Sequence, residues 1–347
     1  MPQAWPALLA AHPAARPARV TEQHRSGYLV AESIDDAQAV ESLPEWLRPR
    51  CDPSARAAVG DWVLIEDAAD RPRIVALLPR RSLIKRGAAG EHYRQQLIAA
   101  NVDTAFVVTG LDADFNPRRI ERYLLLLSGG GVEPVVVLTK LDVARDAPGA
   151  IALLAELAAQ GVAVRSLNAR DADSVATLNP WLGAGRTVVL VGSSGAGKST
   201  LTNTLLGIER MKTGAVRAHD ARGRHTTTHR ALIALPSGAC LIDTPGMREL
   251  KPTGEEPADA AAFADIDLLA ERCRFRDCRH EKEPGCALRD AVQRGELDAA
   301  RLANYLKLHA EVAAAAQALE ARQVKKADPR LQTRASHGRP DDRYGRH

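Results

Sequence analysis

The sequence predicts an α/β domain with a parallel sheet, placed between a small N-terminal β-barrel and a C-terminal, mainly helical module. Three observations support this fold class. Continuous apolar runs alternate with helical segments in residues 93–252, as in parallel sheets that are covered on both faces. Short alternating apolar stretches, separated by Gly and Pro, precede this region. A cluster of cysteines and a long alanine-rich segment follow it.

The composition indicates a globular protein of two or three domains. The chain has 347 residues, of which 45% are hydrophobic and 26% are charged, which is ordinary for this class. No apolar run approaches the roughly 20 residues of a membrane-spanning helix. The N-terminus is interrupted by prolines and lacks a basic start, so we expect no secretory signal, no membrane contact and a cytoplasmic location.

The first two segments of the chain differ in sequence pattern. We expect residues 1–17, which prolines interrupt, to be flexible. Residues 18–92 predict a barrel of the OB kind, whose loops bind RNA or single strands; a generic β-barrel that serves as an adaptor is the alternative. Basic residues near the end of this segment favour nucleic-acid binding. They are Arg71, Arg73, Arg80, Arg81, Lys85 and Arg86.

Five apolar runs predict the parallel strands of the central domain, residues 93–252. They are "TAFVVTG", "VEPVVVLT", "GVAVRSL", "TVVLVG" and "ACLIDTPG". Helical stretches lie between them at 117–131 and 147–161, and each ends at glycine, as helices commonly do. Right-handed crossovers are expected for such an arrangement.

The C-terminal part divides into a helical module, residues 253–324, and a tail, residues 325–347. A long helix is expected from about 296 to 324, and the tail is expected to be basic and disordered. Residues 322–347 hold eight Lys/Arg against three Asp, whereas the whole chain has a net charge of +4. The tail therefore either attracts polyanions such as RNA or is only a solvated end.

The stretch "GSSGAGKST" at 192–200 fits the pattern G-x-x-x-x-G-K-[ST] between a strand and a helix. Its glycines let backbone N–H groups turn toward phosphates. The Lys198 ammonium is placed for the β- and γ-phosphates of a nucleotide and the Ser199 hydroxyl for Mg²⁺. The expected phosphate-binding residues are Gly192, Ser193, Ser194, Gly195, Ala196, Gly197, Lys198, Ser199 and Thr200.

Two further stretches predict a sensor of the γ-phosphate. "LIDTPG" ends a strand with Asp243, placed to hold Mg²⁺ through water, and with Gly246, whose N–H can meet the γ-phosphate. In "RGRHTTTHR" at 222–230, a threonine can ligate Mg²⁺ and close over the nucleotide; a polar surface loop is the alternative. The candidates are Thr226, Thr227 and Thr228, of which Thr227 is favoured.

A guanine-reading motif is predicted at "TKLD", residues 139–142, where another strand ends. Asp142 can accept hydrogen bonds from the base N1–H and the exocyclic amine, a donor pair that adenine lacks. The Lys140 stem can lie across the base, and Thr139 and Leu141 complete the motif. The stretch "RSLNA" at 165–169 is then the last loop on the base side.

The order of these motifs is unusual, because the guanine reader precedes the phosphate loop. This order is a circular permutation of the usual GTPase, which a domain tolerates because its termini normally lie close together at the surface. The chain then runs from the γ-phosphate sensor directly into the next domain. Such an order suits a switch whose moving part drives an attached module.

A metal site is predicted at "CRFRDCRHEKEPGC", with the spacing C-x4-C-x-H-x5-C. Three thiolates and an imidazole form a closed tetrahedral set, as one structural Zn²⁺ requires; three buried cysteines beside an incidental histidine are the alternative. The ligands are Cys273, Cys278, His280 and Cys286. Four arginines lie among or directly before them and favour contact with RNA. They are Arg272, Arg274, Arg276 and Arg279.

Together these features resemble the RsgA or YjeQ family of circularly permuted GTPases that depend on the small ribosomal subunit. The resemblance spans nearly the whole chain and includes the connecting stretches "QQLIAANVDTAFVV" and "RGRHTTTHR". It implies GTP hydrolysis that the 30S subunit stimulates during its late maturation, near the decoding region. It also implies contact with 16S rRNA, a cytoplasmic location and a monomer.

Two stretches depart from the family's pattern, and a third position lacks a side chain that many GTPases use in catalysis. Thr139 stands where the family has Asn, which removes an amide that would brace the base pocket. "RSLNA" differs from the expected Ser-Ala pattern. Met247 follows the sensor glycine where many GTPases place a glutamine that orients the attacking water. We therefore expect slow intrinsic turnover, and His225 is our candidate for positioning the water; an exposed or RNA-contacting histidine is the alternative.

Two other functions are compatible with parts of the pattern. A metabolic P-loop ATPase or kinase would prefer ATP, which the carboxylate of Asp142 disfavours. A non-enzymatic RNA-binding adaptor would use the nucleotide only to set its conformation. Turnover measured with and without 30S subunits distinguishes these functions.

Overall fold

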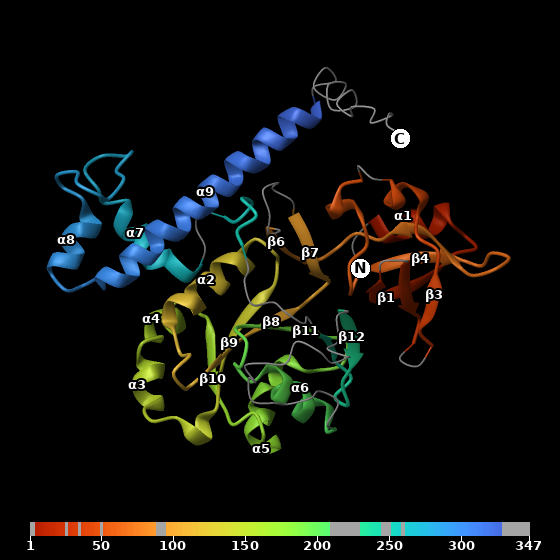
Figure 1. Ribbon diagram of the computed structural model, residues 1–347, viewed down its shortest axis with the longest axis horizontal. Helices are drawn as coiled ribbons and strands as arrows, with labels where there is room; N and C mark the ends of the chain where they lie inside the picture. The colour runs from red at the N-terminus through yellow and green to blue at the C-terminus, as the bar shows by residue number, and fades with distance from the viewer. Residues whose placement is uncertain are drawn as a thin grey trace, which may run out of the picture.

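The computed structural model describes residues 4–24, 27–33, 36–48, 51–87, 95–208, 230–243, 251–257 and 261–327. Three parts follow one another along the chain (Figure 1): a barrel, a mixed sheet with helices on both faces, and a helical module. No helix within these ranges is both long and apolar enough to cross a bilayer.

The barrel has five antiparallel-paired strands in the order β3-β2-β1-β4-β5. An additional parallel bridge joins Glu41, just after β3, to Arg73 at the start of β5, so the first and last strands approach each other. Val20, Val30 and Val63 point inward and are fully buried. The strands are β1 (Arg16–His24), β2 (Gly27–Ala31), β3 (Gln38–Val40), β4 (Trp62–Glu66) and β5 (Arg73–Leu77). Two short 3-10 turns, η1 (Pro44–Leu47) and η2 (Pro53–Ala55), lie between β3 and β4.

A helix lies in the N-terminal segment that the sequence predicts to be flexible. Helix α1 (Ala4–Ala11) is followed directly by β1. The Trp5 ring packs edge-on against Trp62 with centroids 6.0 Å apart, and its indole N–H donates to the Pro79 carbonyl. Burial of this aromatic pair gives the segment a fixed partner on the outside of the barrel, which its prolines did not reveal.

The central sheet has the strand order β10-β9-β8-β11-β13-β12. All neighbours are parallel except β12 and β13, which are antiparallel. The edge strand β12 also pairs with β1, which joins the sheet to the barrel. The strands are β8 (Thr104–Gly110), β9 (Glu133–Thr139), β10 (Ala163–Ser166), β11 (Thr187–Val191), β12 (Ala231–Ala234) and β13 (Cys240–Asp243).

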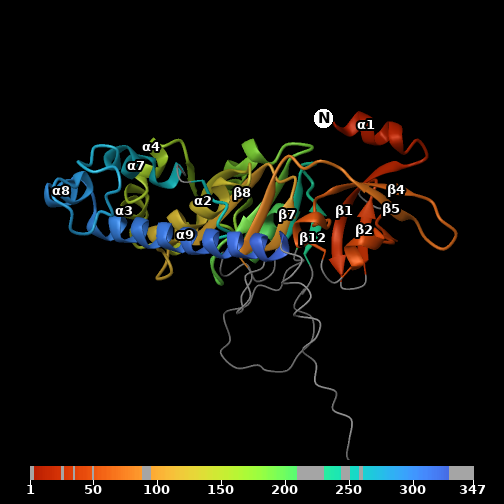
Figure 2. The same ribbon diagram turned by 90° about the horizontal axis from the view of Figure 1, so that it is seen from above.

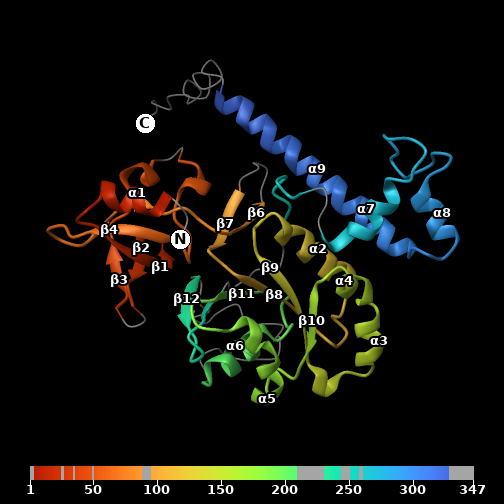
Figure 3. The ribbon, with the colours of Figure 1, turned by 180° about the vertical axis from the view of Figure 1, so that it is seen from behind.

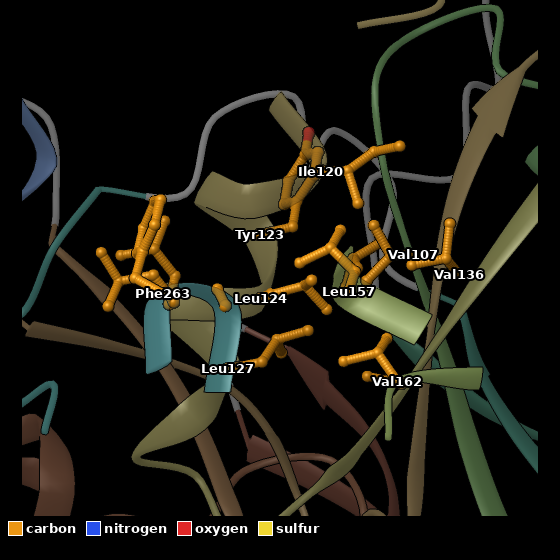
Figure 4. Close-up of a cluster of buried hydrophobic side chains, with 14 of the residues drawn as sticks. Val107, Ile120, Tyr123, Leu124, Leu127, Val136, Leu157, Val162 and Phe263 are labelled. Carbon is orange, nitrogen blue, oxygen red and sulfur yellow. The ribbon is translucent and has the colours of Figure 1, made fainter. Parts of the chain in front are cut away.

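Two layers of helices cover this sheet (Figure 3). One core lies under α2 and α4, where Figure 4 shows Tyr123, Leu124 and Leu127 meeting strand and helix side chains; the other lies under α5 and α6. The elements are α2 (Pro117–Ser128), η3 (Leu141–Val143), α3 (Ala147–Ala152), α4 (Ala155–Ala159), α5 (Ala172–Val175), η4 (Ala176–Trp181) and α6 (Lys198–Leu206).

The helical stretch expected at 147–161 is divided into α3 and α4. Leu153 is exposed at the break, whereas Leu154 and Leu157 are almost fully buried. Leu154 therefore joins the core at the break, directly before α4, and Leu157 joins it from within α4.

A hairpin crosses the expected boundary at residue 92. Strands β6 (Leu83–Gly87) and β7 (Gln95–Ala100) pair with each other in a separate sheet between the barrel and the central domain. The Leu83 N–H donates to the Gly130 carbonyl, and the Gly87 N–H donates to the Lys251 carbonyl. The connection between the first two domains is therefore an ordered structure with its own hydrogen bonds.

The C-terminal module consists of η5 (Ala261–Phe263), α7 (Ala264–Ala270), α8 (Ala287–Gln293) and the long helix α9 (Ala299–Ala327). Figure 2 shows α9 running lengthwise along the molecule, from α8 past α2 toward the barrel side. A buried arginine, Arg301, joins α9 to neighbouring elements by donating to Glu121 of α2 and Asp265 of α7. The helix expected at 296–324 is confirmed, with bounds shifted by three residues.

Candidate nucleotide site and metal centre

The phosphate loop connects β11 to α6 and has the backbone that its glycines predict. Gly192, Gly195 and Gly197 have φ values of +148°, +81° and +92°, which side chains disfavour. A Cβ on Gly192 would lie 2.1 Å from the Val108 carbonyl oxygen of the neighbouring strand. The loop can therefore pass this close to β8 only with glycine at position 192.

The Lys198 side chain turns back over the loop. Its ammonium donates to the carbonyls of Gly192 at 2.8 Å and Ser193 at 2.5 Å. Ser199 and Thr200 are half-buried in the first turn of α6, with backbone N–H groups at the helix N-terminus, where anions are favoured. Ala196 is buried, and Ser194 is exposed at the tip of the loop.

The guanine motif directly contacts the phosphate loop. Thr139 is fully buried, and its hydroxyl donates to the Ala196 carbonyl at 2.6 Å. The same hydroxyl oxygen lies 3.1 Å from where a Cβ on Gly197 would be. The threonine that replaces the expected asparagine thus joins the two motifs by its own hydrogen bond.

Lys140 and Asp142 extend from the end of β9. Lys140 has a left-handed backbone, with φ of +61°, and its stem lies close to Gly110. Asp142 is exposed in η3. The Leu141 N–H donates to the Leu167 carbonyl of the stretch "RSLNA", whose Ala169 carbonyl accepts from Thr204 of α6 at 2.6 Å. The motif and the base-side loop therefore lie side by side.

The sheet topology explains why these motifs meet. Strands β9 and β11 both pair with β8, and β11 also pairs with β13, all in parallel. Their carboxyl ends lie at one edge, where ligands bind in such sheets. Asp243 ends β13 at this edge. The candidates His225, Thr227 and Gly246, together with Met247, lie outside the described residues.

Sequence reasoning missed two carboxylates in the loop between β8 and α2. Asp112 accepts from the Lys140 ammonium at 2.5 Å, and Asp114 accepts from the Ser193 hydroxyl. Arg119 donates to Asp114 at 2.6 Å. The signal was available, because "LDADFN" follows a strand that ends at the same edge of the sheet.

The charged neighbours keep both carboxylates ionised. Burial tends to raise the pKa of Asp112, but the Lys140 ammonium and the Asp114 N–H lower it, with a net fall. Burial likewise tends to raise the pKa of Asp114, and hydrogen bonds from Arg119 and Ser193 bring it below its ordinary value. Both groups are therefore negatively charged at neutral pH.

The four expected metal ligands come together between α7 and α8. The ligand atoms of Cys273, Cys278, His280 and Cys286 all lie within 4.8 Å of one another. The His280 Nδ1 atom lies 3.5 Å from the sulfurs of Cys273 and Cys286. Burial lowers the pKa of His280, and the nearby Glu283 carboxylate opposes this shift only in part. The lowered pKa favours the neutral imidazole that metals bind. The donor set and its spacing fit a tetrahedral ion.

A tight loop presents His280. Its backbone is left-handed, with φ of +61°. The Glu283 carboxylate accepts from the N–H groups of Arg279, Glu281 and Lys282 at 3.0 to 3.2 Å. The interleaved arginines Arg272, Arg274, Arg276 and Arg279 are all exposed.

Several basic residues that were expected to form a nucleic-acid-binding patch on the barrel instead form hydrogen bonds and ion pairs within the protein. Arg80 donates to both oxygens of the buried Asp61, and to the carbonyls of Ser54 and Arg56. Lys85 pairs with Glu255 at 2.6 Å, and Arg86 donates to Gln96. Sequence clustering did not show that these cations stabilise the barrel and its junction with the rest of the chain.

This strand order and the joined phosphate and guanine motifs define a P-loop GTPase whose chain order is circularly permuted. A family model described as RsgA GTPase matches residues 77–253. The chain belongs to the RsgA GTPase family, which is a family of GTP hydrolases, and the predicted resemblance is confirmed.

The curated relatives and solved structures agree with this assignment. A "Small ribosomal subunit biogenesis GTPase RsgA" from Xanthomonas axonopodis pv. citri is 67% identical over 92% of this chain and 87% of that protein. Its counterpart from Xanthomonas oryzae pv. oryzae is 66% identical over the same shares.

The solved structures show the same fold. YjeQ from Thermotoga maritima has a TM-score of 0.61 at 23% identity, over 86% of this chain and 98% of that one. YloQ, described as a circularly permuted GTPase, has a TM-score of 0.59 at 24% identity, over 86% of this chain and 95% of that one.

Proposed function

We propose that this protein is a GTPase that acts in late maturation of the 30S ribosomal subunit and is stimulated by that subunit. The hydrogen bond from Thr139 to the Ala196 carbonyl is the observation that carries the nucleotide part, because it holds the guanine and phosphate motifs together. The ribosomal part is supported by the name of relatives that are 67% identical over most of the chain.

Each chemical role that GTP binding requires has a candidate residue in this chain. The Asp142 carboxylate would accept from the guanine edge and reject adenine. Lys198 would neutralise the β- and γ-phosphates, while Ser199 and Asp243 would hold Mg²⁺ with GTP or GDP, directly and through water. Gly246 and Thr227 remain our candidates for sensing the γ-phosphate. Bound Mg²⁺ would supply the positive charge that offsets the negative charge on the phosphate oxygens during phosphoryl transfer.

Turnover is proposed to depend on the ribosome. Met247 follows Gly246 and has no group that can orient water. His225 remains our candidate for that role, and we propose that binding to the 30S subunit completes the catalytic site. The competing adaptor function requires nucleotide binding without turnover.

We further propose one structural Zn²⁺ per chain, held by Cys273, Cys278, His280 and Cys286. The barrel is proposed to be of the OB type, because its strand order and the Glu41–Arg73 bridge match a five-stranded closed arrangement. With Arg80 and Lys85 engaged internally, the exposed arginines of the metal module are the better candidates for contact with 16S rRNA. We propose that the protein acts as a monomer in the cytoplasm, in keeping with this function.

A turnover assay tests this proposal. GTP and ATP hydrolysis is measured with the wild-type protein alone, with 30S subunits and with 50S subunits. We expect slow GTP hydrolysis alone, a large increase with 30S subunits only, and no use of ATP. ATP preference would indicate the ATPase alternative, and GTP binding without stimulated turnover would indicate the adaptor.

A further inference from the structure

The loop between β8 and α2, residues 111–116, lies between the two nucleotide motifs and contacts both. Its Asp112 carboxylate receives the Lys140 ammonium of the guanine motif at 2.5 Å. Two residues later, the Asp114 carboxylate receives the Ser193 hydroxyl of the phosphate loop. One short loop thus holds a side chain from each motif.

The loop is itself firmly anchored. The Asp114 N–H donates to Asp112 at 3.1 Å, and the Arg119 guanidinium donates to Asp114 at 2.6 Å. Asn116 caps α2 by accepting from the N–H groups of Arg118 and Arg119. Because both carboxylates are fixed by donors on two sides, they can hold Lys140 and Ser193 in place.

These contacts restrict the groups that meet a nucleotide. Because its ammonium is held at Asp112, Lys140 keeps its aliphatic stem against Gly110. A Cβ atom on residue 110 would lie only 3.2 Å from that stem. The stem is the part of Lys140 that would lie across the base. Ser193 is the first residue after Gly192, so its anchored hydroxyl fixes the start of the phosphate loop. Because these groups are already ordered in the free protein, the entropy loss of ordering them does not weaken nucleotide binding.

We propose that Asp112 and Asp114 are positioning residues that preorganise the guanine lysine and the phosphate loop for nucleotide binding. This inference rests on the proposed guanine-nucleotide function. Neither carboxylate needs to touch the ligand: Asp112 acts through Lys140, and Asp114 acts through Ser193. Through these two carboxylates, the loop between β8 and α2 has a role in nucleotide binding, although it contains none of the expected nucleotide motifs.

Equilibrium and kinetic binding of fluorescent GDP tests the proposal. Asp112→Asn and Asp114→Asn keep the side-chain size and remove the charge. We expect each to raise the Kd for GDP about tenfold, chiefly through faster dissociation, with the melting temperature of the nucleotide-free protein nearly unchanged. Asp70→Asn, at an exposed aspartate in the β4–β5 loop, is the matched control and should bind like wild type.

Double variants show whether the carboxylates act through their partners. Ser193→Ala should weaken binding about as much as Asp114→Asn, and the combination should add little. Lys140→Met and Asp112→Asn should be non-additive in the same way. Where an aspartate variant does not fold, Ser193→Ala or Lys140→Met removes the same contact from the other side.

The outcomes separate this proposal from the function on which it rests. Wild-type protein that binds no guanine nucleotide would overturn both. Tight binding by wild type with unchanged Kd values in both aspartate variants would overturn the positioning role alone. Fully additive effects in the double variants would also overturn it, because the carboxylates would then not act through Lys140 and Ser193.

Discussion

At the scale of single residues, Thr139 has the clearest structural consequence. The sequence suggested that replacing asparagine would loosen the base pocket, since an amide that could brace it is lost. The buried hydroxyl instead donates to the Ala196 carbonyl at 2.6 Å. The threonine side chain is therefore long enough to connect the end of β9 with the phosphate loop.

Thr139→Val should weaken nucleotide binding, because it keeps the shape and leaves the Ala196 carbonyl without this donor. An unsatisfied buried acceptor costs about 1–3 kcal/mol, and at the lower end of this range the Kd for GDP should rise about five- to tenfold in calorimetry. Thr139→Ser keeps the donor and serves as the control. Equal affinity of the valine and serine variants would show that the hydrogen bond does not support binding.

Asp142 decides which base is read. Asp142→Asn replaces an acceptor with an amide that can donate, so we expect GDP affinity to fall about 100-fold or more and xanthosine diphosphate to become the better ligand. Competition binding with the two diphosphates measures the change. Unchanged preference in the variant would contradict the guanine assignment of residues 139–142.

At the scale of elements, the strands and the long helices were predictable and the interruptions were not. The apolar runs of β8, β9 and β11 match the parallel strands, because strands buried on both faces have a continuous apolar pattern. The interruption between α3 and α4 leaves no signal in the local pattern, and α1 depends on Trp5 meeting Trp62. That aromatic pairing is a tertiary contact that local pattern does not contain.

The candidate site shows the same division. Motif spacing predicted the phosphate loop, the base reader and the metal ligands, because each is a local sequence signature. It did not predict that Arg80 would be held by Asp61 within the barrel, nor that Asp112 would meet Lys140. Those pairings depend on which elements pack together, so the sequence could indicate only the residue types.

The metal module should lose its ion and its local order when one ligand is removed. Cys286→Ser should reduce bound zinc from the proposed one ion per chain to almost none, because a structural site needs all four ligands. Elemental analysis measures the metal, and protease cleavage between residues 264 and 298 measures the order. Cys51→Ser, at a cysteine in the barrel, should retain the zinc. Full zinc content in the Cys286 variant would refute the ligand set.

At the scale of the whole molecule, residues 251–257, which follow the proposed γ-phosphate sensor, are held by both flanking domains. The Lys251 carbonyl accepts from Gly87 of β6, and Glu255 pairs with Lys85 of the same strand. Gly254 packs so closely on α9 that a Cβ would lie 2.3 Å from the Ala316 nitrogen. The permuted chain order therefore leads from the sensor directly to β6, next to the barrel, and to the helix that carries the metal module.

Arg301, which is 3% exposed, is one of the residues that join the C-terminal module to the GTPase domain. Its guanidinium contacts Glu121 of α2, Glu156 of α4 and Asp265 of α7. Burial tends to lower the pKa of Arg301, but these carboxylates outweigh it and raise the pKa, so the charge is retained. Removing one partner from a buried ion network commonly costs about 3–5 kcal/mol, because the remaining charges are left uncompensated.

Arg301→Met should therefore loosen α9 on α2, to which Asn304 and Glu311 still bind, while leaving the nucleotide motifs in place. We expect faster protease cleavage near the start of α9 and lost stimulation by 30S subunits, with GTP turnover in their absence close to wild type. Arg294→Met removes an arginine from an exposed pair with Glu296, and it should change neither property. If the Arg301 variant kept full 30S stimulation despite a loosened helix, the module would not transmit ribosome binding through α9. The γ-phosphate sensor would then have to communicate through the β6 side of the junction.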